Sequence, residues 1–466
     1  MSVLPYKFLG YARNDDKNSA ALHYYLRRTN PFEPVEPTEP AEPLSYAIKE
    51  HHAPRATSPS ISIFPKGDLL LSNTSFFESE LFSELTEDLH QSSRFTATYR
   101  IAAPTYEEAK KIAFGIAVEQ TVECPYELVD GTPIADTIVG QIEDLKKAEA
   151  GAYYATISYE PEAVGDEMAE LLNMLFGNTS LQPGVRLMSF ELPETMYNNY
   201  PGPRFGRSGL RDLCGVPRGP ILMSAIKPLG RSPKELAQMV YDLALGGCPI
   251  IKDDHSLMDQ HYAPFKERVL QCVMALADAK EKTGRKSMYI ANCTTDGLGF
   301  LERAYQAKEI GADGIMAAPA ITGFTMIRDL ARDPDFGLPI FLHPCFSGPL
   351  VLSQDAGISP FCYYGQLSRL AGADAVIFTS FGGRFSFSQD TCQKIAEGTE
   401  SKMADLRASF PVPSGGMRWQ LFKEMVRIYG PDTIFLVGGA LQTEGPDLTA
   451  NTKFFLEKLA EAAGEK

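Results

Sequence analysis

The feature that most constrains the fold is an alternation of short apolar segments with amphipathic helical patterns over residues 221–463. Each apolar segment has the length of a buried strand. The eight predicted strands are 221–226, 249–251, 288–291, 314–317, 339–342, 375–378, 410–412 and 434–437. Eight strand–helix units in this length match a closed (β/α)8 TIM barrel better than an open sheet, and we expect an α/β protein.

Helical patterns follow most of the predicted strands. The clearest are 233–245, 265–282, 300–310, 419–429 and 452–463, and those of the fourth and fifth helices are the weakest. A connector rich in Pro, Gly and Arg precedes the first barrel strand. We therefore expect the barrel domain to span residues 206–466.

The residues before the barrel predict a smaller α+β (ferredoxin-like) domain over 91–205. Its strands are predicted at 95–101 and 152–159, and its helices at 105–118 and 164–176. Thr105 is placed to cap the first of these helices. Two strand–helix units in a row are the basis of this prediction.

Residues 1–90 are predicted to be a separate N-terminal extension. They contain an acidic, proline-rich segment at 31–43, PFEPVEPTEPAEP. Repeated proline permits only extended, solvated chain, so this segment is predicted to be a spacer or a surface loop.

Composition excludes several classes of partner. The formal net charge of −15 argues against a nucleic-acid surface and against binding to anionic membranes. The eight cysteines are scattered singly, which predicts reduced thiols in a cytoplasmic protein. No apolar run of about 18 residues and no signal-peptide pattern occurs, so no membrane span is expected. Nucleotide-binding glycine motifs are also absent, so no nucleotide cofactor is predicted.

A barrel of this kind places catalytic groups just after its strands, where the loops converge at one end. Polar or glycine residues follow seven of the eight predicted strands. They are Lys227; Lys252, Asp254 and His255; Asn292; His343; Ser380 to Arg384; Ser414, Gly415 and Gly416; and Gly438 with Gly439. Their convergence predicts a single active site.

Two glycine pairs end the seventh and eighth strand units. Gly415-Gly416 and Gly438-Gly439 stand where many barrels bind phosphate through backbone N–H groups. Glycine permits such close approach and the positive φ angles of tight turns. Ordinary strand–helix turns are the alternative reading; together the pairs predict one phosphate group on the substrate.

The charged residues each allow two readings. Lys252 with Asp254 predicts a site for a hard cation such as Mg²⁺, or else a buried salt bridge. Lys227 is a candidate for proton transfer, or it grips a phosphate. His343 is a catalytic candidate, or it is a hydrogen-bonded structural residue.

Several motifs occur together in a recognisable order. They are Ile226-Lys227-Pro228, Gly246-Gly247-x-x-x-Ile251-Lys252-Asp253-Asp254, Ser414-Gly415-Gly416 and Gly438-Gly439. As a set they resemble the RuBisCO large-subunit family, and more closely the RuBisCO-like proteins of form IV, over about residues 90–460. In the N-terminal domain, Glu119 and Asn178 match two polar residues of that family that reach across a dimer interface. The resemblance implies a homodimer with the active site at the interface.

The resemblance also implies a metal centre. In the family, the lysine matched by Lys252 is carbamylated by CO2, and the carbamate holds Mg²⁺ together with an aspartate, matched by Asp254, and a glutamate. Here His255 stands in the place of the glutamate. Imidazole is a poor ligand for so hard an ion, so the departure predicts weaker Mg²⁺ binding, a softer metal or no metal.

Other departures argue against carbon fixation. Pro344 and Ile377 replace an arginine and a histidine that bind a second phosphate in the carboxylases. Cys124 replaces a threonine that contacts substrate, and Arg384 replaces the lysine that addresses the attacking gas. The family's second lysine after the one matched by Lys227 is missing, since the sequence runs Lys227-Pro228-Leu229-Gly230. A monophosphate substrate follows from this pattern.

The matched residues that remain imply an enolising lyase or isomerase acting on a phosphorylated, sugar-derived ketone. In that reading Lys227 moves the proton, Lys252 and Asp254 hold Mg²⁺ with His255 as a third ligand, and His343 and Arg384 contact substrate. Glu119 and Asn178 from the partner complete the site, and the glycine pairs hold the phosphate. The alternative is a non-catalytic binding or regulatory protein, and a true ribulose-bisphosphate carboxylase is third.

Overall fold

The computed structural model describes residues 93–149, 151–383 and 387–464, which all belong to one compact unit spanning residues 72–466. The predicted extension at 1–90, its proline-rich segment and Arg384 lie outside the described residues. All eight cysteines are free thiols. In the described part of the chain, no helix combines the length and the apolar character needed to cross a bilayer.

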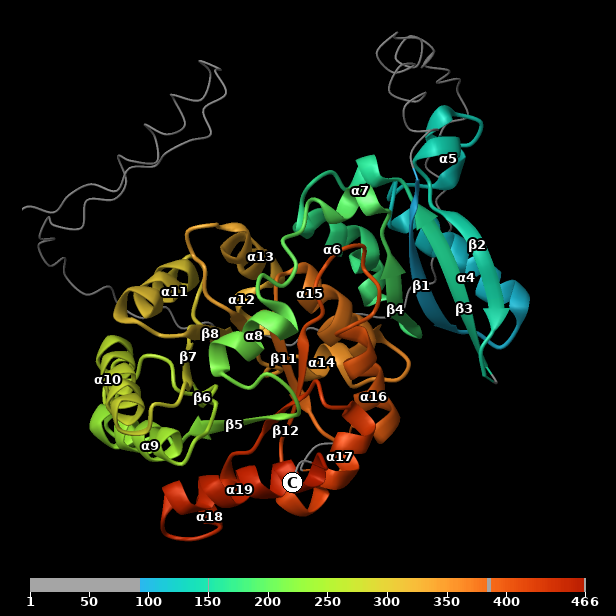
Figure 1. Ribbon diagram of the computed structural model, residues 1–466. Helices are drawn as coiled ribbons and strands as arrows, with labels where there is room; N and C mark the ends of the chain where they lie inside the picture. The colour runs from blue at the N-terminus through green and yellow to red at the C-terminus, as the bar shows by residue number, and fades with distance from the viewer. Residues whose placement is uncertain (1–92, 150, 384–386, 465–466) are drawn as a thin grey trace, which may run out of the picture. The chain divides into compact units, whose positions relative to one another are not determined.

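The eight predicted barrel strands are confirmed, and they form one parallel sheet (Figure 1). They are β5 (Ile221–Ile226), β6 (Ile250–Asp253), β7 (Met288–Asn292), β8 (Gly314–Ala317), β9 (Ile340–Leu342), β11 (Ala375–Thr379), β12 (Phe410–Ser414) and β13 (Ile434–Leu436). Hydrogen bonds join them in the order β12-β11-β9-β8-β7-β6-β5-β13, and β12 and β13 also pack against each other. The sheet therefore closes into the predicted TIM barrel.

Side chains of the barrel strands point alternately to two cores, because successive residues of a strand face opposite sides. Met223, Ile290 and Phe341 belong to the cluster inside the barrel. Leu222 and Ile251 belong to the larger cluster between strands and helices. Burial on both faces explains why the strands are short, continuous apolar runs.

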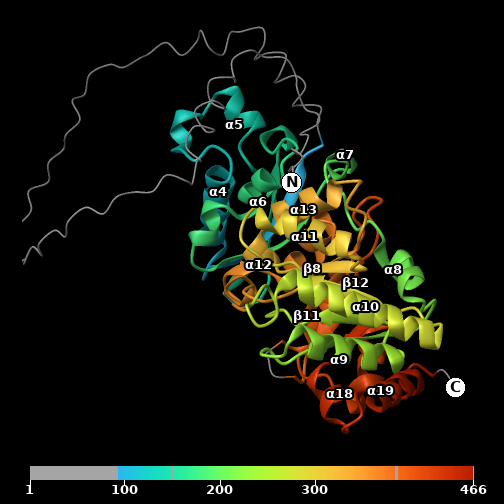
Figure 2. The ribbon, with the colours of Figure 1, turned by 90° about the vertical axis from the view of Figure 1, so that its left-hand side faces the viewer.

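Helices surround the barrel, and Figure 2 shows α9 and α10 side by side on its outer face. They are α9 (Pro233–Leu245), α10 (Phe265–Thr283), α11 (Gly299–Ile310), α13 (Phe324–Arg332), α15 (Ser368–Leu370), α16 (Gln389–Gly398), α17 (Phe422–Tyr429) and α19 (Leu448–Ala462). Ser232 and Glu235 form a capping box on α9. Gly284 ends α10 with φ 66°, a conformation that favours glycine.

The weakly predicted fourth and fifth helices have irregular forms. The fourth begins as the short α12 (Pro319–Thr322) before α13, and the fifth begins as a π-helix, η4 (Phe361–Leu367), before α15. A π-helix does not repeat every 3.6 residues, so its apolar positions do not follow the α-helical pattern. The predicted seventh helix is also corrected, because its first turn is the 3₁₀ helix η5 (Trp419–Leu421).

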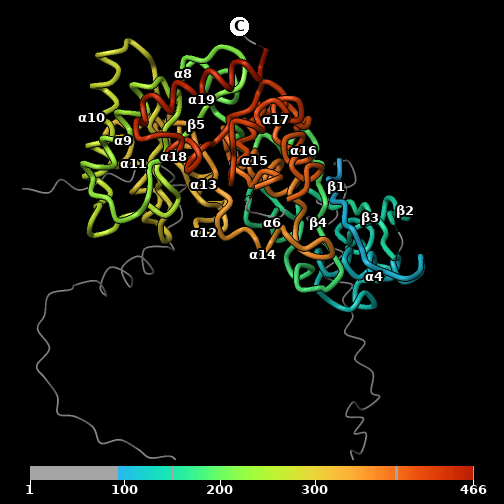
Figure 3. The backbone as a smooth tube through the Cα atoms, turned by 90° about the horizontal axis from the view of Figure 1, so that it is seen from below, coloured from blue at the N-terminus to red at the C-terminus, as the bar shows by residue number. Residues whose placement is uncertain are grey.

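The N-terminal part is the predicted ferredoxin-like domain, which Figures 1 and 3 show beside the barrel. Its elements are β1 (Phe95–Ala102), α4 (Tyr106–Glu119), β2 (Gln141–Lys147), β3 (Ala152–Tyr159), α6 (Met168–Phe176) and β4 (Val185–Glu191). The sheet order β4-β1-β3-β2, with antiparallel neighbours, is that of a split β-α-β arrangement. Two of its strands, β2 and β4, were not predicted.

The missed strand β2 shows why sequence pattern failed there. It is an edge strand with the sequence QIEDLKK, and most of its side chains are exposed. Charged residues keep such an edge soluble, but they remove the apolar alternation from which a strand is predicted. Helix α6 also begins four residues later than predicted, because a 3₁₀ turn at Pro161–Ala163 precedes it.

One short strand links the two predicted domains. β10 (Gly357–Ile358) comes from the loop after β9 of the barrel, yet it pairs in parallel with β4. The first sheet is therefore built from both parts of the chain, and the domain boundary at 205/206 stays a prediction. At the opposite end of the barrel, α8 (Gly206–Cys214) packs Leu210 and Cys214 onto the interior cluster.

Candidate active site

The predicted rim residues surround a cavity of about 870 Å³ at the carboxyl ends of the barrel strands. Each strand delivers its residues there because all eight run parallel and end at the same side. The predicted residues that line the cavity are Lys227, Lys252, Asp254, His255, His343, Ser414, Gly415, Gly416, Gly438 and Gly439. One site thus collects residues that lie more than 200 positions apart in the sequence.

Strand β6 determines which of three adjacent polar residues face the cavity. The strand continues through Asp253, whereas the sequence predicted that it ends at Ile251. Lys252 and Asp254 line the cavity, and Asp253 between them faces the opposite side. The alternation of a strand therefore assigns the neighbouring carboxylates to different surroundings.

Asp253 belongs to a buried hydrogen-bond network behind the cavity. Its Oδ2 accepts hydrogen bonds from Arg268 Nη2 (3.2 Å) and from the backbone N–H of Asn292 (3.0 Å). Its Oδ1 accepts one from the hydroxyl of Tyr289 (2.7 Å). Arg268 and Asp253 are both fully buried, so the pair satisfies two charges that would otherwise be costly there.

Lys252 is almost completely buried, with 2% of its surface exposed. Burial lowers the pKa of its amine to about 8, although Asp254 and Asp253 favour the charged form. Its Nζ donates to the backbone carbonyl of Asp253 at 2.8 Å. A substantial part of the Lys252 amine is therefore neutral near physiological pH.

Asp254 and the two histidines form the rest of this wall. His255 Nδ1 lies 3.1 Å from Asp254 Oδ1, and its ring stacks on that of His343 at a centroid distance of 4.4 Å. Burial alone would raise the pKa of Asp254, but the His255 hydrogen bond and the Lys252 charge hold it well below its usual range. Burial, and then the charges of Lys252 and His255, hold the pKa of His343 well below its usual range.

One hydrogen bond determines which ring nitrogen of neutral His343 carries the proton. Its Nδ1 accepts from the backbone N–H of Cys345 at 3.1 Å. The neutral ring then carries its proton on Nε2, which makes His343 a hydrogen-bond donor at that atom.

The glycine pairs also line the cavity. Gly415 and Gly416 have φ angles of 83° and 105°, in a backbone region that residues with a Cβ atom rarely adopt. A Cβ atom on Gly438 would lie 2.8 Å from Lys227 Nζ, so glycine there makes room for the lysine. The Ser414 hydroxyl donates to the backbone carbonyl of Phe378 (2.9 Å), which gives it a structural role.

Some predicted residues lie elsewhere. Asn292 and Ser380 do not line the cavity: Asn292 donates to the backbone carbonyl of His255, and the Ser380 hydroxyl lies 3.0 Å from that of Tyr429. Glu119 and Asn178 meet each other at 3.0 Å in the N-terminal domain and are not part of the cavity lining within one chain. Their predicted reach into a partner's site stays a prediction.

Sequence reasoning missed several residues of the cavity wall. Arg418 and Trp419 follow the Gly415-Gly416 pair, and Cys345 follows His343 by two positions. These three are close to predicted residues and were within reach of the strand-end rule. Tyr364 had no such signal, because it comes from the π-helix η4.

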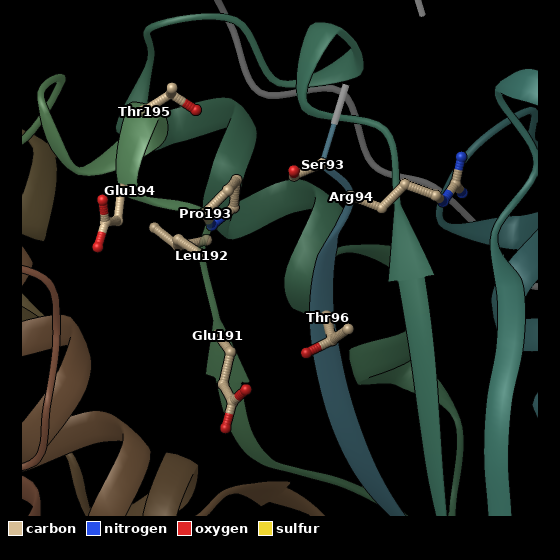
Figure 4. Close-up of a pocket in the computed structure, with 8 residues that line it drawn as sticks. All are labelled: Ser93, Arg94, Thr96, Glu191, Leu192, Pro193, Glu194 and Thr195. Atoms are coloured by element: carbon tan, nitrogen blue, oxygen red, sulfur yellow. The ribbon is translucent and has the colours of Figure 1, made fainter. Parts of the chain in front are cut away.

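A second, more open cavity of about 480 Å³ lies on the N-terminal domain (Figure 4). Glu191 and Glu194 border it, while Arg94 points away, because its guanidinium donates to the carbonyls of Thr137 and Val139. No predicted site residue lines this cavity. Among the described residues, the predicted site residues that line a cavity all line the one in the barrel.

The donor atoms near Lys252 allow a test of the predicted metal site. Within the described ranges, no three His, Cys, Asp or Glu side chains are grouped as a metal site. Asp254 supplies one carboxylate and His255 one imidazole, and Lys252 supplies only an amine. A carbamate on Lys252 would add oxygen donors. The lowered pKa of the Lys252 amine favours its neutral form, which is the form that reacts with CO2. The residues present fit a divalent cation once Lys252 is modified.

Comparison with known proteins identifies the family of this chain. The catalytic-domain family of the ribulose bisphosphate carboxylase large chain matches residues 207–445. The chain is 38% identical to the 5-methylthioribulose-1-phosphate isomerase of Rhodospirillum rubrum, over 79% of this chain and 97% of that protein. It is 32% identical to the 2,3-diketo-5-methylthiopentyl-1-phosphate enolase of Geobacillus kaustophilus, over 75% of this chain and 87% of that protein.

A solved structure gives the same result. The RuBisCO-like protein of Rhodopseudomonas palustris matches with a TM-score of 0.70 and 34% identity, over 80% of this chain and 99% of that chain. The shared fold, the ordered motifs and the cavity at the carboxyl ends of the strands agree with one another. The chain belongs to the ribulose bisphosphate carboxylase large-chain family and, within it, to the RuBisCO-like proteins.

Proposed function

We propose that this protein is an enzyme that moves a proton next to the carbonyl of a phosphorylated, sugar-derived ketone, and that it does not fix CO2. One observation carries the proposal: the lining of a single cavity combines two lysines and a neutral histidine with two glycine turns. The relatives named isomerase and enolase support this class of reaction.

The cavity has groups for one phosphate. Backbone N–H groups at Gly415-Gly416 and at the Gly438-Gly439 turn would hold the phosphate oxygens, with Arg418 and Lys227 as the nearby cations. Among the lining residues that follow β9 are Pro344, Phe346 and Leu352, and residues 343–352 of the lining include no lysine or arginine for a second phosphate. This asymmetry supports a monophosphate with an apolar far end.

The chain's own residues supply the proton transfer. Lys227 would take a proton from the carbon beside the carbonyl, and Nε2–H of His343 would donate to the carbonyl oxygen as negative charge develops there. Return of that proton to the former carbonyl carbon, while the hydroxyl on the deprotonated carbon gives its proton to His343, would move the carbonyl to the neighbouring carbon. Lys252 as a carbamate, Asp254 and His255 would hold a divalent ion such as Mg²⁺, which polarises a carbonyl when bound.

Among such reactions we favour isomerisation of a ketose 1-phosphate over decarboxylation. The relative at 38% identity is named for isomerisation of a 5-methylthio ketose 1-phosphate, and the enolase relative is named for a 5-methylthio 1-phosphate as well. Both names describe a phosphate at one end of the molecule and an apolar group at the other, which suits this cavity.

Solvent exchange tests the proposal. In D2O with Mg²⁺ and bicarbonate, the purified protein should incorporate deuterium into 5-methylthioribulose 1-phosphate, and the product should be an isomer. Lys227→Met should lower the exchange rate by about 10²–10⁴-fold, the usual contribution of a general base. Absence of exchange into every phosphorylated ketone of a panel would reject the enzyme, and incorporation of labelled CO2 into ribulose 1,5-bisphosphate would establish a carboxylase instead.

A non-catalytic binding role is the second candidate. It is favoured by His255, which replaces an oxygen donor of the carboxylases with an imidazole that here stacks on His343. Under this alternative, the protein would bind a phosphorylated ketone without exchanging its C–H hydrogen. Calorimetry of binding beside the exchange assay separates the two candidates. Cytoplasmic location and a homodimer that shares its sites remain part of our proposal.

A further inference from the structure

One wall of the cavity is built by the loop that follows β9. Pro344, Phe346, Val351 and Leu352 of this loop line the cavity. β11 lies between β9 and β12, so the loop stands apart from both glycine pairs along the rim. Because the loop and both glycine pairs line the same cavity, a substrate whose phosphate rests on the glycine turns can reach this wall with its far end.

The loop has a strained backbone at its exposed tip. Phe346 has φ 67°, in the left-handed region that a bulky side chain disfavours, and 74% of its surface is exposed. Ser347 beside it is held firmly, because its hydroxyl donates to the Pro344 carbonyl at 2.6 Å and lies 2.7 Å from that of Tyr364. Such strain persists only where neighbouring contacts enforce the conformation.

The loop does not return directly to the barrel. It ends in β10, which adds to the N-terminal sheet by pairing Gly357 with Arg186 and Ile358 with Leu187. Gly357 has φ 84°, and a Cβ atom there would lie 2.2 Å from the Leu350 carbonyl oxygen. Only glycine fits this turn, so the end of the loop is fixed against β4.

Arg186 joins that sheet to the cavity wall. Its side chain lies buried on β4 and crosses to the loop, where Nη2 donates to the backbone carbonyl of Val351 (3.1 Å) and Nη1 to Gln354 Oε1 (3.2 Å). Val351 is itself buried and lines the cavity. One guanidinium of the N-terminal domain thus holds the wall from behind.

Placing Arg186 on β4 has an electrostatic cost, which indicates that its contact with the loop stabilises the structure. Arg186 lies directly opposite Arg100 across the β1–β4 pair, and like charges at such positions are destabilising. Burial, and then the Arg100 charge, lower the pKa of Arg186. Arg100 instead contacts the exposed Glu149 (2.7 Å) and Asp355 (3.0 Å), so it touches the same loop, but at a residue outside the cavity lining.

We propose that Arg186 is a positioning residue that holds Val351 and Leu352 against the far end of the substrate, so that the N-terminal domain sets the specificity for that end. The identity of the substrate in this inference rests on the proposed function. The anchoring itself rests on the contacts of Arg186 alone.

The test compares Arg186→Met with Arg186→Lys and with Arg100→Met as the matched control. For 5-methylthioribulose 1-phosphate, Arg186→Met should raise KM at least tenfold while kcat changes less than threefold. For ribulose 1-phosphate, which lacks the apolar tail, KM should change less than twofold. Arg186→Lys keeps one donor and should recover most of the loss, and Arg100→Met should leave both KM values within twofold of the parent.

Amide hydrogen exchange over residues 349–352, which include the Arg186 contact at Val351 but not the Arg100 contact at Asp355, supplies a readout that needs no turnover. Exchange there should be at least tenfold faster in Arg186→Met than in Arg100→Met. Equal KM changes for both substrates, or unchanged exchange in the loop, would overturn the inference. If the parent protein turns over neither ketose, the proposed function fails, and the exchange rates alone decide whether Arg186 anchors the wall.

Discussion

At the scale of single residues, the segment Lys252-Asp253-Asp254-His255 shows how adjacent groups take different roles. Asp253 is fully buried with Arg268, whereas Asp254 lines the cavity and contacts His255. The sequence showed that charges cluster here, but it did not show which carboxylate faces the cavity. That assignment depends on strand β6 continuing through Asp253, because one residue more or less reverses every side chain.

This division of roles predicts unequal costs of substitution. Asp253→Asn leaves Arg268 buried without a counter-charge and should lower the free energy of unfolding by about 3–5 kcal/mol. Asp254→Asn removes a partly exposed contact and should cost about 1 kcal/mol or less, while activity falls. Urea unfolding of the two variants measures both values, and equal losses of stability would contradict the assignment.

At the scale of elements, the ends of strands and helices are joined by buried polar side chains. Asp374 immediately precedes β11, and its carboxylate accepts hydrogen bonds from the backbone N–H groups of Phe205 and Gly206, where α8 begins. It also accepts one from Ile340, where β9 begins. This carboxylate therefore fixes three elements at the end of the barrel opposite the active site.

Burial raises the pKa of Asp374 to about 6, although its three N–H donors oppose the rise. The folded state thus prefers the protonated acid more than the unfolded chain does. The stability from this preference is fully present below about pH 4 and is lost as pH rises through about 6. Relative to Asp374→Asn, the parent should lose about 2–3 kcal/mol of unfolding free energy over that range.

Denaturant unfolding of both proteins at several pH values between 4 and 7 measures this difference. The asparagine lowers the baseline, because its amide cannot accept from every backbone donor, so the comparison uses the slopes. Parallel stability curves for the two proteins would show that Asp374 does not titrate in this window.

At the scale of the whole molecule, the cavity of one chain contains neither Glu119 nor Asn178. The two residues meet on the N-terminal domain, and exposed apolar side chains, Leu128 and Leu181, occur in the same part of the chain. An exposed apolar surface next to paired polar groups is typical of an interface. In a homodimer in which each N-terminal domain completes the partner's site, the two polar residues would reach the partner's cavity and the apolar side chains would be covered.

Complementation tests this arrangement. Asn178→Ala and Lys252→Ala should each inactivate the protein if each site draws one residue from either chain. Mixed dimers then contain one intact site, so an equal mixture refolded together should recover about a quarter of the parent activity. No recovery, together with a monomer in sedimentation, would reject the shared site.

The success of prediction from the sequence differs from element to element. The barrel strands were predictable because burial on both faces makes each a continuous apolar run, and the residues at their carboxyl ends could be read off directly. The edge strand β2 was missed because it is charged, and β10 was missed because two residues carry no pattern. Their pairing partners are remote in sequence, so only the folded chain reveals them.

The sequence by itself determined the barrel, the ferredoxin-like domain and most of the residues at the mouth, because periodicity and strand ends are local properties, and its ordered motifs indicated the family. The tertiary structure alone decided that Asp253 faces Arg268, that His255 stacks on His343, and that Arg186 holds Val351. These contacts join residues from separate elements, and their formation depends on packing, burial and the direction of each side chain. No local pattern of residues encodes those quantities.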